Sequence, residues 1–391
     1  MQTAAVIAEY NPFHNGHAYQ LTQLRLAGAT HIVVVMSGNF VQRGGPAIFE
    51  KRLRAAAALH NGADLILELP LPYAMATAER FAFGAVSLVA ACGCVDLLYF
   101  GSECGSLPLL EQTAQALESP RLPNLMAPYL AQGLPFAAAR SRALAQGFSP
   151  ALAQVLEEPN NTLAVEYLRQ LHRAGAAIQT ATLRRQGADH HSSGTCQGFA
   201  SATWLRERLT LGEEILPFVP SSAAQLYAQA AIASPALGER AVLARLRSLS
   251  AQEYTSLPDL SEGIERRLKN AVAGAASLEE VFTLAKTKRY PLARLRRLAF
   301  SAYLGLDGSL CRQSPPYLRV LGHNQRGREV LARMRSTAAL PVCASLAKLE
   351  KTSPLCRAFA QAEASSCDLY NLFEARLRPC GWDYTEGPVI L

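Results

Sequence analysis

Two histidines three residues apart follow the first apolar run of the chain. Residues 3–8 predict a strand that leads directly into a His-x-Gly-His element formed by His14, Gly16 and His17. At the start of a helix this spacing places both imidazoles on one face, and the helix N-terminus adds unpaired N–H groups and a partial positive charge. Gly16 leaves room for a phosphate. The element therefore predicts a site for nucleotide phosphates such as those of ATP, where His14 and His17 stabilise charge that develops on the α-phosphate.

A second polar segment is expected to complete this site. Ser201, Thr203 and Arg206 open a predicted helix after the last predicted strand, and the segment resembles the one that follows the sheet in His-x-Gly-His nucleotidylyltransferases. Hydroxyl groups, helix N–H groups and a guanidinium one turn further on suit phosphate oxygens, although a Ser here is also an ordinary helix cap. The chain has no Gly-x-x-x-x-Gly-Lys-Ser/Thr loop and no Lys-Met-Ser-Lys-Ser stretch. P-loop enzymes and ordinary aminoacyl-tRNA synthetases are therefore excluded.

The pattern of apolar runs predicts an α/β domain that positions these segments. Strands are expected at residues 3–8, 31–36, 64–69, 95–100 and 179–184, and helices at 17–27, 49–60, 76–91, 109–117 and 202–209. This alternation is typical of a Rossmann-like, parallel sheet. Pro217 and Pro220 close this part, and the Ala-, Leu- and Arg-rich remainder carries few strand signals. We therefore expect two domains, residues 1–220 and a largely helical 221–391.

Composition describes a globular chain that is larger than one hydrophobic core usually fills. Of its 391 residues, 50% are apolar and 18% charged, which excludes disordered and coiled-coil classes. No apolar run reaches the roughly 20 residues of a membrane span, and no secretory signal opens the chain, so we expect a cytoplasmic protein. Nine cysteines without a Cys-x-x-Cys pair predict neither disulfides nor a structural metal. Cys92 and Cys94 are expected to be buried thiols.

Positive charge is concentrated in the second part. Residues 1–220 hold 15 basic and 16 acidic side chains, whereas 221–391 hold 23 basic and 15 acidic ones. Such asymmetry indicates a polyanionic partner, with nucleic acid favoured over a merely solvated helix face. The densest cluster contains Lys286, Lys288, Arg289, Arg294, Arg296 and Arg297.

Longer motifs resemble one family throughout the first part of the chain. They are Ala8 to His17, Met36 to Gly44, Ala63-Asp64-Leu65 with Glu68-Leu69-Pro70, Phe100 to Glu103, Pro159-Asn160-Asn161, Arg185 with Gly187-Ala188-Asp189-His190, and Ser201-Ala202-Thr203. In order and spacing they resemble the tRNA(Met) cytidine acetate ligase family. The resemblance is dense up to about residue 210 and thinner afterwards.

The resemblance implies an ATP-dependent ligase. Acetate and ATP would form acetyl-adenylate and pyrophosphate in residues 1–220, and the acetyl group would pass to the exocyclic amine of the wobble cytidine of elongator tRNA(Met), bound by the basic cluster of 221–391. Magnesium would accompany ATP without a dedicated protein metal site. With the helix segment included, the ATP-binding residues would be Ile7, Ala8, Glu9, Tyr10, Asn11, Pro12, Phe13, His14, Asn15, Gly16, His17, Ala18, Tyr19, Gln20, Gly101, Asn160, Arg185, Ser201, Thr203 and Arg206.

Two other hypotheses stay open. The nucleotide site could serve an adenylyltransferase that acts on a small phosphorylated metabolite, which the basic second part disfavours. A non-catalytic RNA-binding protein is disfavoured by the intact His-x-Gly-His element. The sequence departs from the family pattern at Gly45 and at His190-His191-Ser192, so the role of that second loop is not assigned. No motif bears on the acetate pocket, on tRNA selection or on the oligomeric state.

Overall fold

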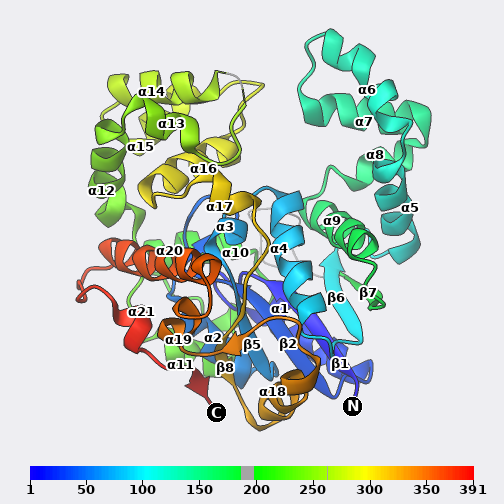
Figure 1. Ribbon diagram of the computed structural model, residues 1–391, viewed down its shortest axis with the longest axis vertical. Helices are drawn as coiled ribbons and strands as arrows, with labels where there is room; N and C mark the ends of the chain where they lie inside the picture. The colour runs from blue at the N-terminus through cyan, green and yellow to red at the C-terminus, as the bar shows by residue number, and fades with distance from the viewer. Residues whose placement is uncertain (186–197, 262) are drawn as a thin grey trace.

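A mostly parallel sheet forms the centre of the molecule (Figure 1). The computed structural model describes residues 1–185, 198–261 and 263–391. Five parallel strands lie in the order β5-β2-β1-β6-β7, with bounds Leu65–Leu69, His31–Ser37, Thr3–Ala8, Leu97–Ser102 and Gln179–Arg184. Their carboxyl ends therefore share one edge of the sheet. This confirms the predicted α/β fold with a parallel sheet.

The central strands β1, β2 and β5 are buried on both faces, apart from the last two residues of β1, because helices cover each side. Ala5 and Val33 belong to one core together with residues of α4 and α9, whereas Ala4 and Val34 belong to another with residues of α1 and α2. Alternate strand residues point to opposite faces, so apolar residues at every position are required. These helices are α1 (Asn15–Leu26), α2 (Lys51–His60), α4 (Ala78–Ala91) and α9 (Pro159–Ala174).

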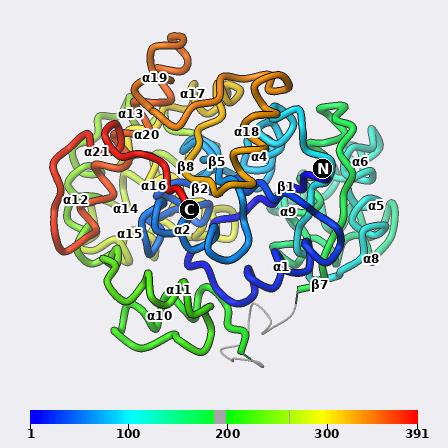
Figure 2. The backbone as a smooth tube through the Cα atoms, turned by 90° about the horizontal axis from the view of Figure 1, so that it is seen from below, coloured from blue at the N-terminus to red at the C-terminus, as the bar shows by residue number. Residues whose placement is uncertain are grey.

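Two groups of helices extend from the sheet and have cores of their own. Figure 1 shows both beyond the same end of the sheet, and Figure 2 shows them on opposite sides of the molecule. The first group comprises α5 (Leu107–Glu118), α6 (Leu122–Ala131), α7 (Phe136–Gly147) and α8 (Pro150–Val155). The second, here called the basic lobe, comprises α12 (Pro235–Ser248), α13 (Ala251–Ser256), α14 (Ile264–Gly274), α15 (Leu278–Ala285) and α16 (Leu292–Tyr303).

Shorter elements and the C-terminal helices complete the molecule. The helical ones are α3 (Leu71–Ala74), α10 (Ala202–Thr210), η1 (Leu216–Phe218), α11 (Ser221–Tyr227), α17 (Gly308–Arg312), α18 (Gln325–Thr337), α19 (Leu346–Glu350), α20 (Pro354–Tyr370), η2 (Asn371–Phe373) and α21 (Trp382–Thr385). The remaining strands are β3 (Phe40–Val41), β4 (Gly45–Pro46), β8 (Leu318–His323), β9 (Val342–Cys343) and β10 (Val389–Ile390). No helix among the described residues has the length and apolar character to cross a membrane.

The second half of the chain contributes to the central sheet, which the sequence pattern did not predict. Strand β8 pairs antiparallel with β5, and β10 pairs with β8. The basic lobe is helical as expected, but the chain returns to the first part after it. A domain division near residue 220 stays a prediction, and a shared sheet joins the two parts.

Three predicted helix starts differ from the observed ones by two residues because of their caps, whereas the helix predicted from residue 202 begins there. The helix expected from residue 17 begins at Asn15, with His14 as its N-cap. Those expected from residues 49 and 76 begin after the caps Glu50 and Thr77. A side-chain oxygen or nitrogen that accepts an N–H of the first turn fixes each start. Cys92 and Cys94 are buried free thiols, as predicted.

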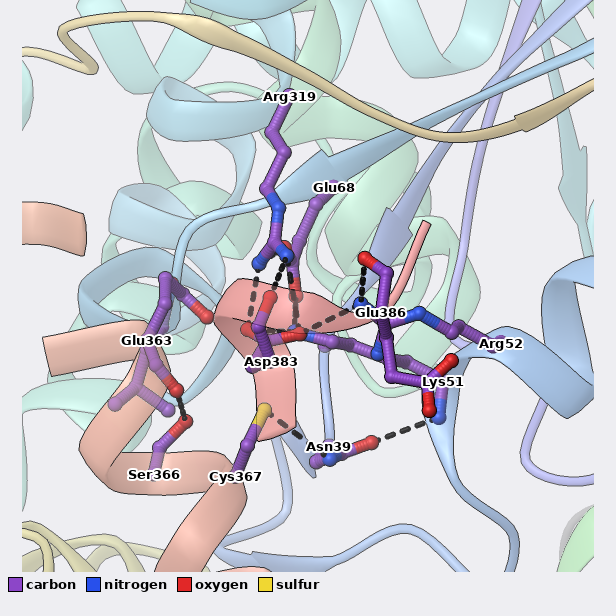
Figure 3. A network of polar contacts seen from close by, with 12 residues as sticks. Asn39, Lys51, Arg52, Glu68, Arg319, Glu363, Ser366, Cys367, Asp383 and Glu386 are labelled. Carbon is purple, nitrogen blue, oxygen red and sulfur yellow. Dashed lines mark hydrogen bonds and ion pairs between the residues drawn. The ribbon is translucent and has the colours of Figure 1, made fainter. Parts of the chain in front are cut away.

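A buried network of charges fixes the C-terminal segment to the sheet (Figure 3). Asp383 is 1% exposed and accepts from Lys51 Nζ at 2.9 Å, Arg52 Nη2 at 2.9 Å and Arg319 Nη1 at 2.7 Å. Glu68 accepts from Lys51 at 2.7 Å and from Arg319 at 2.8 Å. Buried charges persist only when they are paired and hydrogen-bonded. The network therefore couples α2, β5, β8 and α21.

Glu363 of α20 lies beside this network, but its protonation state differs from that of Glu68 and Asp383. It is 2% exposed, and its Oε1 accepts the N–H of Leu71. Burial and, to a smaller extent, the neighbouring carboxylate of Glu68 raise the pKa of Glu363 to about 8. The side chain is therefore protonated at neutral pH.

Candidate functional site

A cleft of about 2030 Å³ lies at the carboxyl ends of the parallel strands. Its walls come from the loop after β1, the β3–β4 hairpin, the ends of β6 and β7, the starts of α9 and α10, and helices α12, α15 and α16 of the basic lobe. Ligands of open parallel sheets bind at this edge. The cleft is therefore the candidate site, and it brings the two parts of the chain together.

The histidines of the His-x-Gly-His element stack on each other at the start of α1. Their ring centroids are 3.7 Å apart. His14 Nδ1 accepts the N–H of Gly16 at 3.0 Å, and His17 Nδ1 accepts the N–H of His14 at 3.3 Å. Because each Nδ1 accepts a hydrogen bond, each neutral ring carries its proton on Nε2. Both imidazoles are thus set as Nε2–H donors.

Burial keeps both rings uncharged. Burial and, to a smaller extent, the cations of Arg185 and Arg206 lower the pKa of His14 to about 3. Burial also lowers the pKa of His17 well below its ordinary value, with His14 and Arg185 adding to the effect. The pair is neutral at pH 7 and donates hydrogen bonds without contributing a positive charge. The charge of the site comes from the two arginines.

The stacked arrangement explains why residue 16 is a glycine. A Cβ at Gly16 would lie 2.9 Å from Cε1 of the His14 ring, closer than real Cβ contacts. We expected Gly16 to leave room for a phosphate, whereas in the structure its missing side chain leaves room for the His14 ring. On the other side, Tyr10 packs edge-on against His17 with a centroid distance of 4.8 Å.

A buried arginine that the sequence argument missed holds the ends of β1 and β2 together. Arg54 of α2 is fully buried, and it donates Nε to Phe49 O at 2.8 Å and Nη1 to Glu9 O at 2.5 Å. It also donates to the carbonyls of Ser37 and Gly38. A rigid guanidinium fork that spans four carbonyls fixes the backbone at the entry to the histidine loop.

Tyr227 of α11 fixes the other side of the histidine loop and was also missed. Its hydroxyl accepts the N–H of Phe13 at 3.0 Å and lies 3.2 Å from the carbonyl of the same residue. Neither residue gave a signal in the sequence, because Arg54 lies in an Ala-rich helix and Tyr227 lies 214 positions from its partner.

The start of α10 contacts the histidine loop through Arg206. Its guanidinium donates Nη1 to Asn11 O at 2.7 Å and Nη2 to Thr203 Oγ1 at 3.0 Å. Burial lowers the pKa of Arg206, and the carboxylate of Glu9 opposes that shift. Ser201 Oγ accepts the N–H of Trp204 at 3.2 Å, which makes it the helix cap. The segment therefore lines the cleft beside the histidine loop, and its serine hydroxyl acts as the helix cap.

Asn160 and Arg185 meet through Glu103, a third residue that the sequence argument left unassigned. Both oxygens of Glu103 accept backbone N–H groups at the start of α9, from Asn160 at 3.2 Å and Asn161 at 2.7 Å. The Asn160 amide nitrogen also donates to Glu103, at 2.5 Å, so its Oδ1 faces Arg185 Nη1 at 3.4 Å. The position of Glu103 directly after β6 was the available signal.

Most predicted nucleotide-site residues line the cleft, and four do not. The residues that line it are Ile7, Ala8, Glu9, Tyr10, Asn11, His14, Gly16, His17, Tyr19, Gln20, Gly101, Asn160, Arg185, Ser201, Thr203 and Arg206. Phe13 lies in the core, and Asn15 Nδ2 donates to Gly198 O and Pro217 O. Pro12 and Ala18 also lie outside the cleft lining.

The predicted basic cluster divides between the cleft and the outer surface. Lys286, Arg296 and Arg297 line the cleft, whereas Lys288 and Arg289 do not. Arg297 Nη2 contacts Asp259 Oδ2 at 3.1 Å, as an ion pair at the edge of the lobe.

Arg294 is tied to the same aspartate. It donates to the carbonyl of Asp259 at 2.6 Å and does not line the cleft. The β3–β4 hairpin packs against the lobe here. Gly44 lies so close to α16 that a Cβ on this residue would be 2.4 Å from the backbone nitrogen of Arg297.

Metal ligands and the loop that contains His190 and His191 were the other features considered in the sequence. Among residues 1–185, 198–261 and 263–391, no three His, Cys, Asp or Glu side chains form a group that could hold a metal ion. Gly187, Asp189, His190 and His191 lie outside the described residues.

The chain is similar to known proteins over nearly its whole length. The family model described as HIGH Nucleotidyl Transferase matches residues 1–380. The tRNA(Met) cytidine acetate ligase of Clostridium perfringens is 33% identical over all of both chains, and that of Syntrophotalea carbinolica is 38% identical over 89% of this chain and 86% of its own. Two crystal structures of Thermotoga maritima TmcAL cover 100% of both chains, the apo form with TM-score 0.94 at 29% identity and the form bound with alpha-thio ATP with TM-score 0.92 at 30% identity.

Proposed function

The chain belongs to the HIGH nucleotidyl transferase family, among its tRNA(Met) cytidine acetate ligases, and from this premise we propose the reaction that it catalyses. It activates acetate with ATP, forming acetyl-adenylate and releasing pyrophosphate. It then transfers the acetyl group to the exocyclic amine of the wobble cytidine of elongator tRNA(Met), releasing AMP. The enzyme is an ATP-dependent ligase, and its location is the cytoplasm, where tRNA is found.

The neutral histidine pair beside two arginines carries this proposal. Attack on the α-phosphate by acetate increases negative charge on the phosphate oxygens, and preorganised donors at that position lower the barrier. His14 and His17 supply Nε2–H groups from one stack. Arg185 and Arg206 both act on the His14 imidazole and supply the positive charge. This combination suits a reaction at the α-phosphate.

The rest of ATP would extend along the ends of β1, β6 and β7. Gly101 presents bare backbone at the end of β6, and the amide of Asn160 is oriented by Glu103 for a ribose or base contact. The cleft-lining members of the Ile7 to Gln20 loop would surround the phosphates. Magnesium would bind through the phosphates, since it keeps most of its water shell and needs few protein ligands.

The basic lobe would place the tRNA on the opposite wall of the cleft. Lys286 and Arg296 are exposed cations that line the cleft, so phosphates next to the anticodon would lie beside them. Lys288, Arg289, Arg294 and Arg297 would extend this surface around the lobe. The wobble base would then enter the cleft toward the histidine pair.

An incubation of the protein with ATP, labelled acetate and tRNA tests the proposal. Acetylcytidine in the digested tRNA, formed in step with AMP, is the expected result. The adenylyltransferase hypothesis instead requires stable transfer of AMP to a phosphorylated metabolite. Release of ADP would contradict both reactions, because attack would then occur at the terminal phosphate.

A further inference from the structure

Glu9 is a cleft carboxylate whose position is fixed from two sides. It directly follows β1 and precedes the histidine loop. Its Oε1 accepts the N–H of Gln42 at 2.9 Å, and its backbone carbonyl accepts from Arg54 Nη1 at 2.5 Å. Within the described part of the chain, Oε2 makes no hydrogen bond. The side chain therefore presents one oxygen that accepts no hydrogen bond within the described residues, although its charge acts on Arg206.

Several other polar side chains of the cleft are already engaged in hydrogen bonds or act as donors. Both oxygens of Glu103 are occupied by N–H groups of α9. His14 and His17 are Nε2–H donors, because each Nδ1 accepts a backbone N–H. Glu239 lies on α12 of the basic lobe, where its Oε1 accepts the N–H of Leu278 at 2.9 Å. Glu9 combines an available oxygen with a place beside the histidine loop.

The second step of the proposed reaction needs such a group. The exocyclic amine of cytosine is a weak nucleophile, because its lone pair is delocalised into the ring. When its nitrogen attacks the acetyl carbonyl, the nitrogen gains positive charge and must lose a proton. A positioned base that takes this proton lowers the barrier, typically by on the order of 10²–10⁴ in rate.

We propose that Glu9 is the general base of acetyl transfer, a role that rests on the proposed function. A bond forms between the cytidine N4 and the acetyl carbon, and the bond from that carbon to the phosphate oxygen of AMP breaks. The N4 proton moves to Glu9 Oε2, and AMP leaves as the anion. The carboxylate then releases the proton to water. In this reaction the backbone of Glu9 shapes the nucleotide loop, while its side chain acts on the tRNA base.

Glu9→Gln separates this role from nucleotide binding. The amide oxygen can still accept the N–H of Gln42, so the loop is held, but the side chain no longer takes a proton. Two rates are measured: acetate-dependent ATP–pyrophosphate exchange, and single-turnover transfer from acetyl-adenylate preformed on the protein. Transfer is expected to fall about 10²-fold, at least ten times more than exchange.

Asp368→Asn is the matched control, because it removes the same charge from a carboxylate that has one oxygen bound to a backbone N–H and does not line the cleft. It is expected to leave the transfer rate within threefold. Equal losses of exchange and transfer in Glu9→Gln would assign Glu9 to nucleotide binding and overturn the proposal. A selective transfer loss in Asp368→Asn as large as that in Glu9→Gln would overturn it as well. If the unaltered protein forms neither acetyl-adenylate nor acetylcytidine, the proposed function itself fails.

Discussion

Replacement of Asp383 by asparagine tests how strongly the buried charge network holds the C-terminal segment. Asp383 receives hydrogen bonds from Lys51, Arg52 and Arg319, and both of its oxygens are used. In Asp383→Asn an amide NH2 replaces one of the two carboxylate oxygens. This group is itself a donor, so it cannot accept hydrogen bonds from the cations that the oxygen binds. Lys51 and Arg319 would then share the carboxylate of Glu68, whereas Arg52 would keep only its hydrogen bonds to the carbonyls of Glu386 and Gly387.

The expected loss of stability follows from burial. Removing one partner of a buried ion pair costs about 3–5 kcal/mol, because the remaining charges lose solvation and gain no partner. For a single transition of 391 residues, an unfolding entropy of about 2.1 cal/mol/K per residue converts this loss into a decrease in Tm of about 4–6 °C.

Asp259→Asn is the matched control for this measurement. Asp259 pairs with Arg297 at 3.1 Å, but its side chain is 29% exposed. Its φ of 58° is one that asparagine also adopts. A partly exposed pair contributes about 0–1 kcal/mol, so the expected decrease in Tm is about 1 °C or less. Differential scanning calorimetry of both variants at pH 7 measures the difference. Equal Tm values for the two variants would refute the reasoning from burial.

Three further predictions concern the site and the network. His14→Asn keeps a side-chain cap for α1 but removes the Nε2–H donor, so the ATP–pyrophosphate exchange rate should fall on the order of 10²–10³ with Tm nearly unchanged; an undiminished rate would remove His14 from catalysis. Replacing Lys286 and Arg296 with glutamine should flatten the salt dependence of tRNA affinity more than replacing Lys288 and Arg289, because the first pair lines the cleft; equal slopes would contradict the division of the cluster. Burial raises the pKa of Glu363 from 4.5 to about 8, so its contribution to folding is complete below pH 4.5 and is lost as pH rises toward 8; urea titrations across this range should show a smaller loss in Glu363→Gln, and identical pH profiles would refute the assignment.

The local signals of the first part of the chain were sufficient to predict its strands and the histidine element. The runs of apolar residues in β1 and β2 are buried on both faces, so they appear in the sequence without interruption. His14, Gly16 and His17 are close in sequence, and their hydrogen bonds span two or three residues. Because these contacts join neighbouring residues, the local sequence is sufficient to predict them. The sequence also predicted that Ser201 to Arg206 start a helix.

Longer-range features were decided by the tertiary structure. Strand β8 holds Arg319, a residue that argues against a buried strand until Glu68 and Asp383 are brought beside it, 251 and 64 positions away. The link from Glu103 through Asn160 to Arg185 joins the ends of two strands and the start of a helix. Which cations of the basic lobe face the cleft depends on how α16 packs against the β3–β4 hairpin. Sequence specifies the residue types of such contacts, but only the packing of distant segments determines which of them meet.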